Sequence, residues 1–310
     1  MKIMKSCYVF VAAVTALLAL ACSKDVPSQE DGLVTANVTL NLADIQGEMT
    51  KASEGLYPEV ENWIFDFFYV QFNADGISVR SGHRRTEVSI GSLVVTEAVM
   101  LQTVPGNSTV TFVANVRPAG SSYSYVPNWE NGSTILIADN IASYKTVKFD
   151  MTERLSMAED GSLKHVPMCG YWVGPVTASP FDLTATLGRM IVRLNVQITN
   201  NSGAALTQVA LKDAAAKAYI FPQVDNTPLD ADADYMDIPA NTVDIAEGAS
   251  TMLCFYTAPN FCNGDGGKRT SLTFTKAGGQ TASIELGNEA EYGDFNLYMN
   301  TIYNYNITVK

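Results

Sequence analysis

The stretch VTANVTLNL, residues 34–42, has an apolar side chain at every second position. These residues are Val34, Ala36, Val38, Leu40 and Leu42, and polar residues stand between them. Because side chains of a β-strand alternate between the two faces of a sheet, the pattern predicts a strand with one buried and one solvated face. An amphipathic helix would need apolar residues three and four positions apart.

The same alternation recurs along the rest of the chain. Further predicted strands are WIFDFFYVQFN (63–73), STVTFVANV (108–116), KTVKFDM (145–151), MIVRLNVQIT (190–199), STMLCFYT (250–257), TSLTFTK (270–276), TASIEL (281–286) and TIYNYNITVK (301–310). Turn-forming stretches such as NADG (73–76) separate them. Residues 92–101, which could equally be irregular, and 138–144 are short helix candidates. We therefore predict an all-β fold with two tandem β-sandwich domains, immunoglobulin-like or transthyretin-like, with Greek-key connections.

The N-terminus has the features of a secretory signal. Lys2 and Lys5 precede an apolar stretch that ends in small residues. LALAC (18–22) resembles a bacterial lipobox, in which the cysteine receives lipid and becomes the first residue after cleavage. We expect residues 1–21 to be a signal peptide and Cys22 to carry acyl chains that anchor in outer-membrane lipid. The alternative is an ordinary signal peptide with an unrelated cysteine.

The strand pattern also predicts how the mature chain is divided. PVTASPFDLTATLG (175–188) interrupts the strands and suggests an internal boundary. We expect a lipidated tether and first strand over 22–51, an N-terminal β-sandwich over 52–183 and a C-terminal β-sandwich over 184–310.

Composition and motifs argue against several functions. The net charge of −12 and the sparse basic residues disfavour a nucleic-acid partner. His83 and His165 stand in no recognisable catalytic motif. The acidic residues of 230–237 resemble the start of a calcium loop, but the turn glycine and the distal glutamate are missing. We expect no enzymatic activity, no cofactor and no metal site.

Three cysteines remain beyond the signal and the lipidation site, namely Cys169, Cys254 and Cys262. Cys254 and Cys262 could pair across a hairpin in an oxidising compartment. The other interpretation, which the apolar strand around Cys254 favours, is that both are buried thiols.

Several short blocks resemble the fimbrillin family of Bacteroidetes type V pili. These blocks are the lipobox, the strand 34–42, GEMTKASEG (47–55), FFYVQFNADG (67–76), HVPMCGYW (165–172), LGRMIVRLNVQITN (187–200) and LYMNTIYNYNITVK (297–310). Each block is degenerate, but their order covers nearly the whole mature chain. The resemblance implies a structural subunit of a surface fimbria that supports adhesion, located at the outer membrane.

The resemblance also implies an assembly mechanism. A trypsin-like protease would cut between Lys51 and Ala52, although shaft subunits of the family typically have arginine at this position. Arg84-Arg85 is a less suitable alternative. The first strand would then leave, and a strand of another subunit would fill the exposed groove. The C-terminal strand is the candidate donor, through Ile302, Tyr303, Tyr305, Ile307 and Val309.

Partners implied by the resemblance are other fimbrial subunits and a host or bacterial surface receptor. The alternative is a stand-alone surface lipoprotein that binds carbohydrate or protein. Trp63, Trp172 and the aromatic residues Tyr123, Tyr125 and Trp129 could stack on sugars in that case, although tryptophans on strands are more often core residues.

Overall fold

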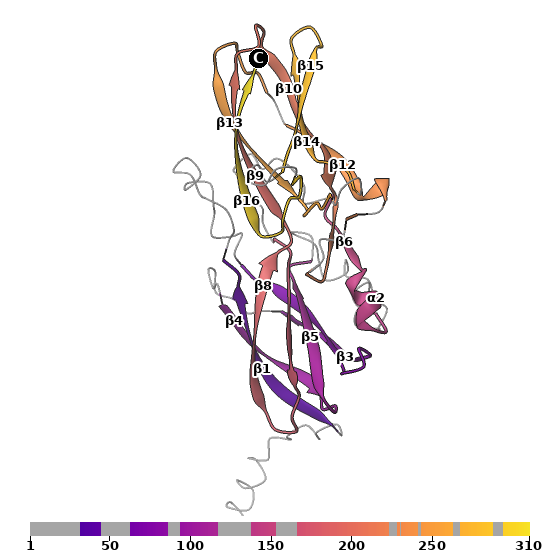
Figure 1. Cartoon of the computed structure of the whole chain (residues 1–310). Coiled ribbons are helices and arrows are strands. Elements are labelled where there is room, and N and C mark those ends of the chain that lie inside the picture. Colours follow the sequence, from indigo (N-terminus) through magenta and orange to yellow (C-terminus); the bar gives the residue numbers. More distant parts are fainter. Residues whose placement is uncertain are drawn as a thin grey trace, which may run out of the picture.

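The computed structural model describes most of the predicted strands. The described residues are 32–44, 63–85 (without the side chain of residue 85), 94–116, 138–152, 166–222, 228–229, 231–240, 243–262, 267–287 and 294–310. Two β-units lie end to end and form an elongated molecule (Figure 1). Among the described residues, one five-residue α-helix and one short 3-10 helix accompany the strands, so the predicted all-β class is confirmed. Within these ranges, no helix combines the length and apolar character that a membrane crossing requires.

The N-terminal unit is a seven-stranded sheet that folds over on itself. Its order is β3-β2-β5-β7-β8-β1-β4. The strands are β1 (Leu33–Leu42), β2 (Asp66–Phe72), β3 (Ser78–Arg85), β4 (Val94–Gln102), β5 (Asn107–Ala114), β7 (Met168–Pro175) and β8 (Phe181–Arg189). β7 and β8 pair only at Met168–Arg189 and Cys169–Gly188, where the sheet turns its corner. The Tyr69 hydroxyl of β2 donates to the Met100 carbonyl of β4, across the resulting sandwich, at 3.1 Å.

The C-terminal unit contains two facing sheets. One has the order β12-β10-β14-β15 and the other β13-β9-β16. Their strands are β9 (Val192–Asn200), β10 (Leu206–Ala215), β12 (Tyr235–Pro239), β13 (Ser250–Thr257), β14 (Ser271–Lys276), β15 (Thr281–Glu285) and β16 (Thr301–Val309). A small additional sheet pairs β6 (Lys148–Asp150) with β11 (Lys217–Tyr219), and η5 (Asp232–Asp234) precedes β12.

The aromatic strand β2 is buried on both faces. All seven of its residues are buried. One face lies in the sandwich, and helix α2 (Ile141–Lys145) covers the other by placing the ring of Tyr144 5.3 Å from that of Phe72. Asn140 caps this helix by accepting from the Ser143 amide. This second cover explains why WIFDFFYVQFN is apolar nearly throughout instead of alternating.

Two local predictions need correction. Within the helix candidate 92–101, the described residues 94–101 are not helical, because they belong to β4, which pairs with β1. Residues 181–189 are not an interruption, because they form β8. The predicted boundary between residues 183 and 184 falls inside this strand, and the sheets change only after it, at Met190 and Ile191.

Candidate functional site

Strand β1 lies in the middle of its layer, between β4 and β8. It pairs antiparallel with β4, where Val38 opposes Glu97, and parallel with β8, where Val38 opposes Leu183. A central strand has both backbone edges hydrogen-bonded, whereas an edge strand has one. We call this position, bounded by β4 and β8, the β1 slot.

One face of β1 supplies part of the sandwich core. Val34, Ala36, Val38 and Leu40 are at most 2% exposed. Leu42, at the end of the strand, is half-buried. Each fully buried Val or Leu side chain contributes roughly 1.5–3 kcal/mol relative to exposure, so an empty slot would be unfavourable.

The opposite face of β1 makes polar contacts with its neighbours. The Asn37 amide donates to the Asp182 carboxylate at 2.8 Å, and the hydroxyls of Thr39 and Thr96 lie 3.3 Å apart. These contacts are between exposed groups and contribute little energy each. The apolar face therefore provides most of the side-chain energy that holds β1.

The C-terminal strand β16 lies at the edge of its sheet. It runs parallel to β9, and the described part of the chain supplies no second strand beside it in the sheet. Alternation places Tyr303, Tyr305, Ile307 and Val309 on one face and Ile302 on the other. Tyr305 and Val309 are buried there, whereas Tyr303 and Ile307 are half-buried, and burial raises the pKa of Tyr303 to about 12.

A specific contact holds β16 against the other sheet. The Tyr305 hydroxyl donates to the Gly287 carbonyl at 2.8 Å and lies 3.1 Å from the Gly287 amide nitrogen. Among the described residues, β16 is paired with a strand along one edge only. Because β16 is an edge strand, it can be moved without disrupting the centre of its sheet.

Several predicted site residues fall outside the described residues. Cys22, Lys51 and Ala52 are among them, so the predictions of lipidation and cleavage remain predictions. Arg84, in the less suitable dibasic site, lies within β3 opposite Phe67. Its Nε atom donates to the Ala98 carbonyl at 2.8 Å, so a protease would first have to displace a paired strand.

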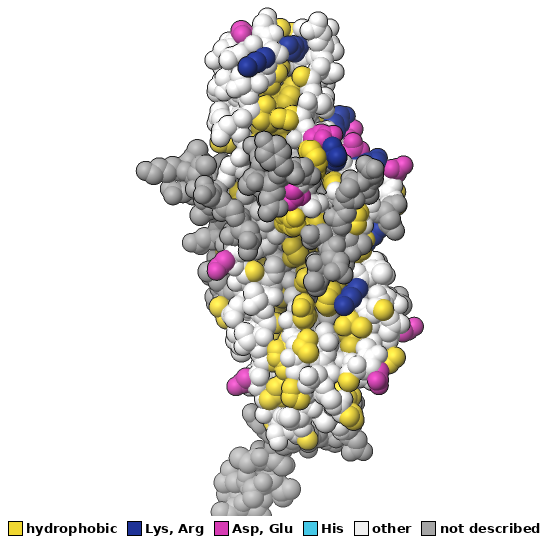
Figure 2. All heavy atoms as spheres, in the orientation of Figure 1, with side chains coloured by type: hydrophobic (Ala, Val, Ile, Leu, Met, Phe, Trp, Pro, Cys, Tyr) yellow, Lys and Arg dark blue, Asp and Glu magenta, His cyan; other side chains and the backbone are white. Residues whose placement is uncertain are grey.

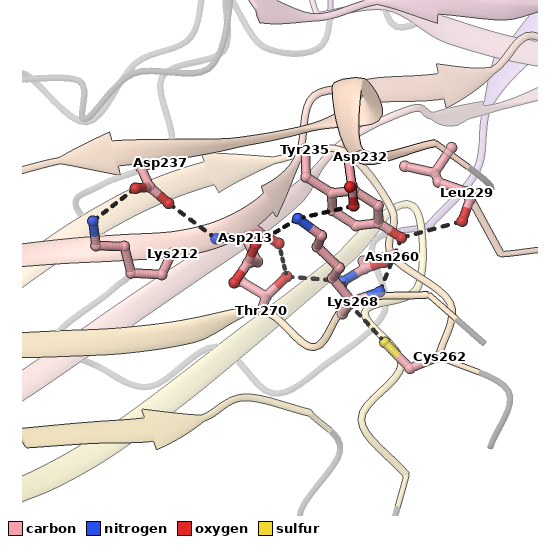
Figure 3. A network of polar contacts seen from close by, with 10 residues as sticks. All are labelled: Lys212, Asp213, Leu229, Asp232, Tyr235, Asp237, Asn260, Cys262, Lys268 and Thr270. Carbon is pink, nitrogen blue, oxygen red and sulfur yellow. Dashed lines mark hydrogen bonds and ion pairs between the residues drawn. The ribbon is translucent and has the colours of Figure 1, made fainter. Parts of the chain in front are cut away.

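The acidic residues of the calcium-like segment are neutralised by lysines. Lys212 contacts Asp237 at 2.7 Å, and Lys268 contacts both Asp213 and Asp232 (Figure 3). Asp234 is bound by two further lysines, described below, and Asp230 is not among the described residues. Across the ranges that the structure describes, His, Cys, Asp and Glu form no group of three suited to a metal ion.

The two cysteines considered for a disulfide are both thiols in the structure. The sulfur of Cys262 donates to the Lys268 carbonyl at 3.1 Å, which orients it toward the Lys268 backbone (Figure 3). Cys254 stands on β13 opposite Asn195. The interpretation as buried thiols therefore describes this structure, and the pairing does not.

The aromatic residues proposed for sugar stacking do not form a described surface. Trp63 and Trp172 are half-buried, and Trp172 packs 6.0 Å from Phe181. Tyr123, Tyr125 and Trp129 lie outside the described residues, as does His165.

Hydrophobic side chains run along the middle of the face shown in Figure 2. Tyr171 and Val173, both on β7, are exposed, which the sequence pattern did not single out.

Comparisons with known proteins identify this architecture. No protein-family model matches the sequence, and no curated protein matches it. Solved structures do match. The tip fimbrial protein Mfa3 from Porphyromonas gingivalis, truncated at its C-terminus, is 17% identical, with a TM-score of 0.58 over 90% of this chain and 95% of that chain.

Two further structures support the same conclusion. A candidate cell adhesion protein from Parabacteroides distasonis is 14% identical, with a TM-score of 0.61 over 89% of this chain and 88% of that chain. The fimbrial anchor protein Mfa2 from P. gingivalis is 12% identical, with a TM-score of 0.52 over 88% of this chain and 90% of that chain. At these identities the likeness establishes the fold, and it agrees with the fimbrial resemblance of the sequence blocks.

Proposed function

We propose that this chain, which shares its fold with the fimbrial proteins Mfa3 and Mfa2, is a structural and not a catalytic subunit of a surface fimbria. It is exported as a lipoprotein, anchored at the outer membrane through Cys22, and contributes to adhesion together with other fimbrial subunits. The likeness of fold supports the fimbrial role, and the lipobox supports the export route.

We propose further that the subunit assembles by strand exchange. The observation that carries this proposal is the position of β1, an N-terminal strand in the middle of a sheet. Cleavage between Lys51 and Ala52 would separate β1 from the rest of the chain. Its loss would leave two unpaired strand edges and an apolar groove, which together form a template for a new strand.

Strand β16 has the dimensions of a replacement. It is 9 residues long and β1 is 10 residues long. β1 presents five alternate apolar side chains to one face, from Val34 to Leu42, and β16 presents four apolar or aromatic ones, from Tyr303 to Val309. Head-to-tail donation of this kind does not close on itself, so it builds a filament.

Determination of the mature N-terminus tests the proposal. Protein recovered from the cell surface is analysed by mass spectrometry, and purified protein is treated with trypsin and examined for polymers. We expect a start at Ala52 and the appearance of polymers. Lys51→Gln should abolish both results, whereas Lys24→Gln, which changes a lysine before β1, should abolish neither.

The opposite result would contradict strand exchange but not export as a lipoprotein. A lipidated start at Cys22 in all material, with no polymers after proteolysis, would exclude strand exchange by this subunit. A fimbrial anchor or a stand-alone surface lipoprotein would then be the remaining functions.

A further inference from the structure

Three distant parts of the chain meet where β1 ends. The Arg189 Nη1 atom, at the end of β8, donates to the Ala43 carbonyl at 3.1 Å and to the Asn300 side-chain oxygen at 2.7 Å. The Asn300 side-chain nitrogen donates to the Asp44 carbonyl at 2.6 Å. Two side chains from outside β1 therefore bind two consecutive carbonyl oxygens of the residues that follow it.

The two binding side chains are buried and contact each other as well as the residues after β1. Arg189 and Asn300 are 6% and 7% exposed, respectively. Asn300 has a φ of 58°, a left-handed conformation that asparagine tolerates better than most residues. Its backbone amide donates to the carbonyls of Arg189 and Ile191 at 2.9 and 3.0 Å. The side chains are thus preorganised to receive a strand.

Removal of β1 and the residues after it would take away the Asp44 acceptor of Asn300 and one of the two acceptors of the Arg189 Nη1 atom, since that atom keeps its bond to the Asn300 side-chain oxygen. An unsatisfied buried donor costs about 1–3 kcal/mol, and more when it is charged. An incoming strand recovers this energy only if its own carbonyl groups reach the positions of the Ala43 and Asp44 carbonyls. A shift by one residue would also turn its apolar face outward, so the polar and apolar requirements select the same register.

We propose that Arg189 and Asn300 form a carbonyl clamp that fixes the carboxyl end, and hence the register, of the strand in the β1 slot. In the isolated chain this strand is β1. In the fimbria it is the strand of a second subunit. The clamp on β1 stands on the contacts above, and only its action on a second subunit rests on the proposed function.

Hydrogen exchange of the intact chain tests the clamp on β1. Asn300→Asp retains an oxygen for Arg189 but replaces the donor to the Asp44 carbonyl by an acceptor. We expect peptides covering 33–44 to exchange roughly tenfold faster than in the wild type, while peptides of β9 and β13 are unchanged.

Two variants make this measurement specific. Asn306→Asp, an exposed position on β16, introduces the same charge and should leave β1 exchange unchanged. Asn300→Gly keeps the positive φ and removes the whole side chain, so it replaces Asn300→Asp if the latter fails to fold. Equal β1 exchange in the Asn300 variants and in Asn306→Asp would overturn the proposal.

Polymer stability tests the clamp on a second subunit. Polymers of the wild type and of Asn300→Asp are heated in detergent, and we expect the variant polymers to dissociate at a lower temperature. Equal stability would overturn this half of the proposal. Failure of the wild type to polymerise would contradict strand exchange instead, and the exchange rates would still decide whether β1 is clamped.

Discussion

The Nζ atom of Lys148 lies 2.7 Å from the Oδ2 atom of Asp234, and this contact ties β6 to the C-terminal unit. Lys217 of β11 contacts the other oxygen, also at 2.7 Å. The Asp234 side chain is 3% exposed. Burial opposes its charge, but the hydrogen bonds and charges of the two lysines outweigh burial and lower its pKa below 3.8.

Asp234→Asn should therefore destabilise the protein. Removing one partner of a buried ion pair costs about 3–5 kcal/mol, and we expect about 2–3 kcal/mol because both lysines reach solvent. The pKa of Asp234 is lower in the folded state, so the stabilisation is present above pH 3.8 and disappears as the pH falls through the folded pKa. Urea unfolding of both proteins between pH 2 and 7 measures this dependence.

The neighbouring pair provides the control. Lys212 and Asp237 lie at the same distance but are 41% and 54% exposed, so Asp237→Asn should cost at most about 1 kcal/mol. Equal effects of the two variants at neutral pH would show that burial does not determine the strength of these contacts.

Local alternation accounts for much of the fold. It located strands such as β1, β9 and β16 because each has one mainly apolar face. It failed at 92–101, where Val95 and Val99 are four positions apart and fit a helix as well as a strand. Pairing with β1 decides between the two, and that contact is not visible in the local sequence.

The candidate site was only partly predictable for the same reason. The residues of β1 and β16 follow from their own pattern, and the structure adds that β1 is central whereas β16 lies at an edge. The clamp joins residues near positions 44, 189 and 300. Arg189 and Asn300 lie in two of the blocks on which the family resemblance rests, 187–200 and 297–310, but these blocks are far apart in the sequence and only the folded arrangement brings the two side chains together.

The apolar face of β1 gives a second prediction. Leu40 is fully buried between Val95 of β4 and Ala185 of β8. Leu40→Ala should lower the free energy of unfolding by about 2–5 kcal/mol, because it leaves a cavity in the sandwich core. Leu42→Ala, at a half-buried position of the same strand, should cost clearly less. Denaturant unfolding compares them, and equal losses would mean that β1 is not held by its buried face.

Helix α2, which packs on the face of β2 outside the sandwich, gives a third prediction. The Tyr144 ring is 1% exposed and lies 5.3 Å from Phe72 and 6.4 Å from Phe221. Tyr144→Ala should cost about 3–5 kcal/mol, as large-to-small changes of aromatic core residues do. Loss of the helix cap by Asn140→Ala should cost only about 1 kcal/mol. If both variants had the same thermal stability, packing on β2 would not be the main role of α2.

The cysteines give the last prediction. Burial raises the pKa of Cys169 to about 12 and that of Cys262 to about 11. Since the thiolate is the reactive form, both should react slowly with a thiol reagent at pH 8 in the native state.

After unfolding without reductant, protein lacking the signal and Cys22 should titrate three thiols, because Cys254 and Cys262 are not joined. A titre of one would show that the pair is oxidised, and the Cys262 sulfur would then have to leave the Lys268 carbonyl that it contacts at 3.1 Å. Cys262→Ser separates these outcomes, since it should lower a titre of three to two but raise a titre of one to two.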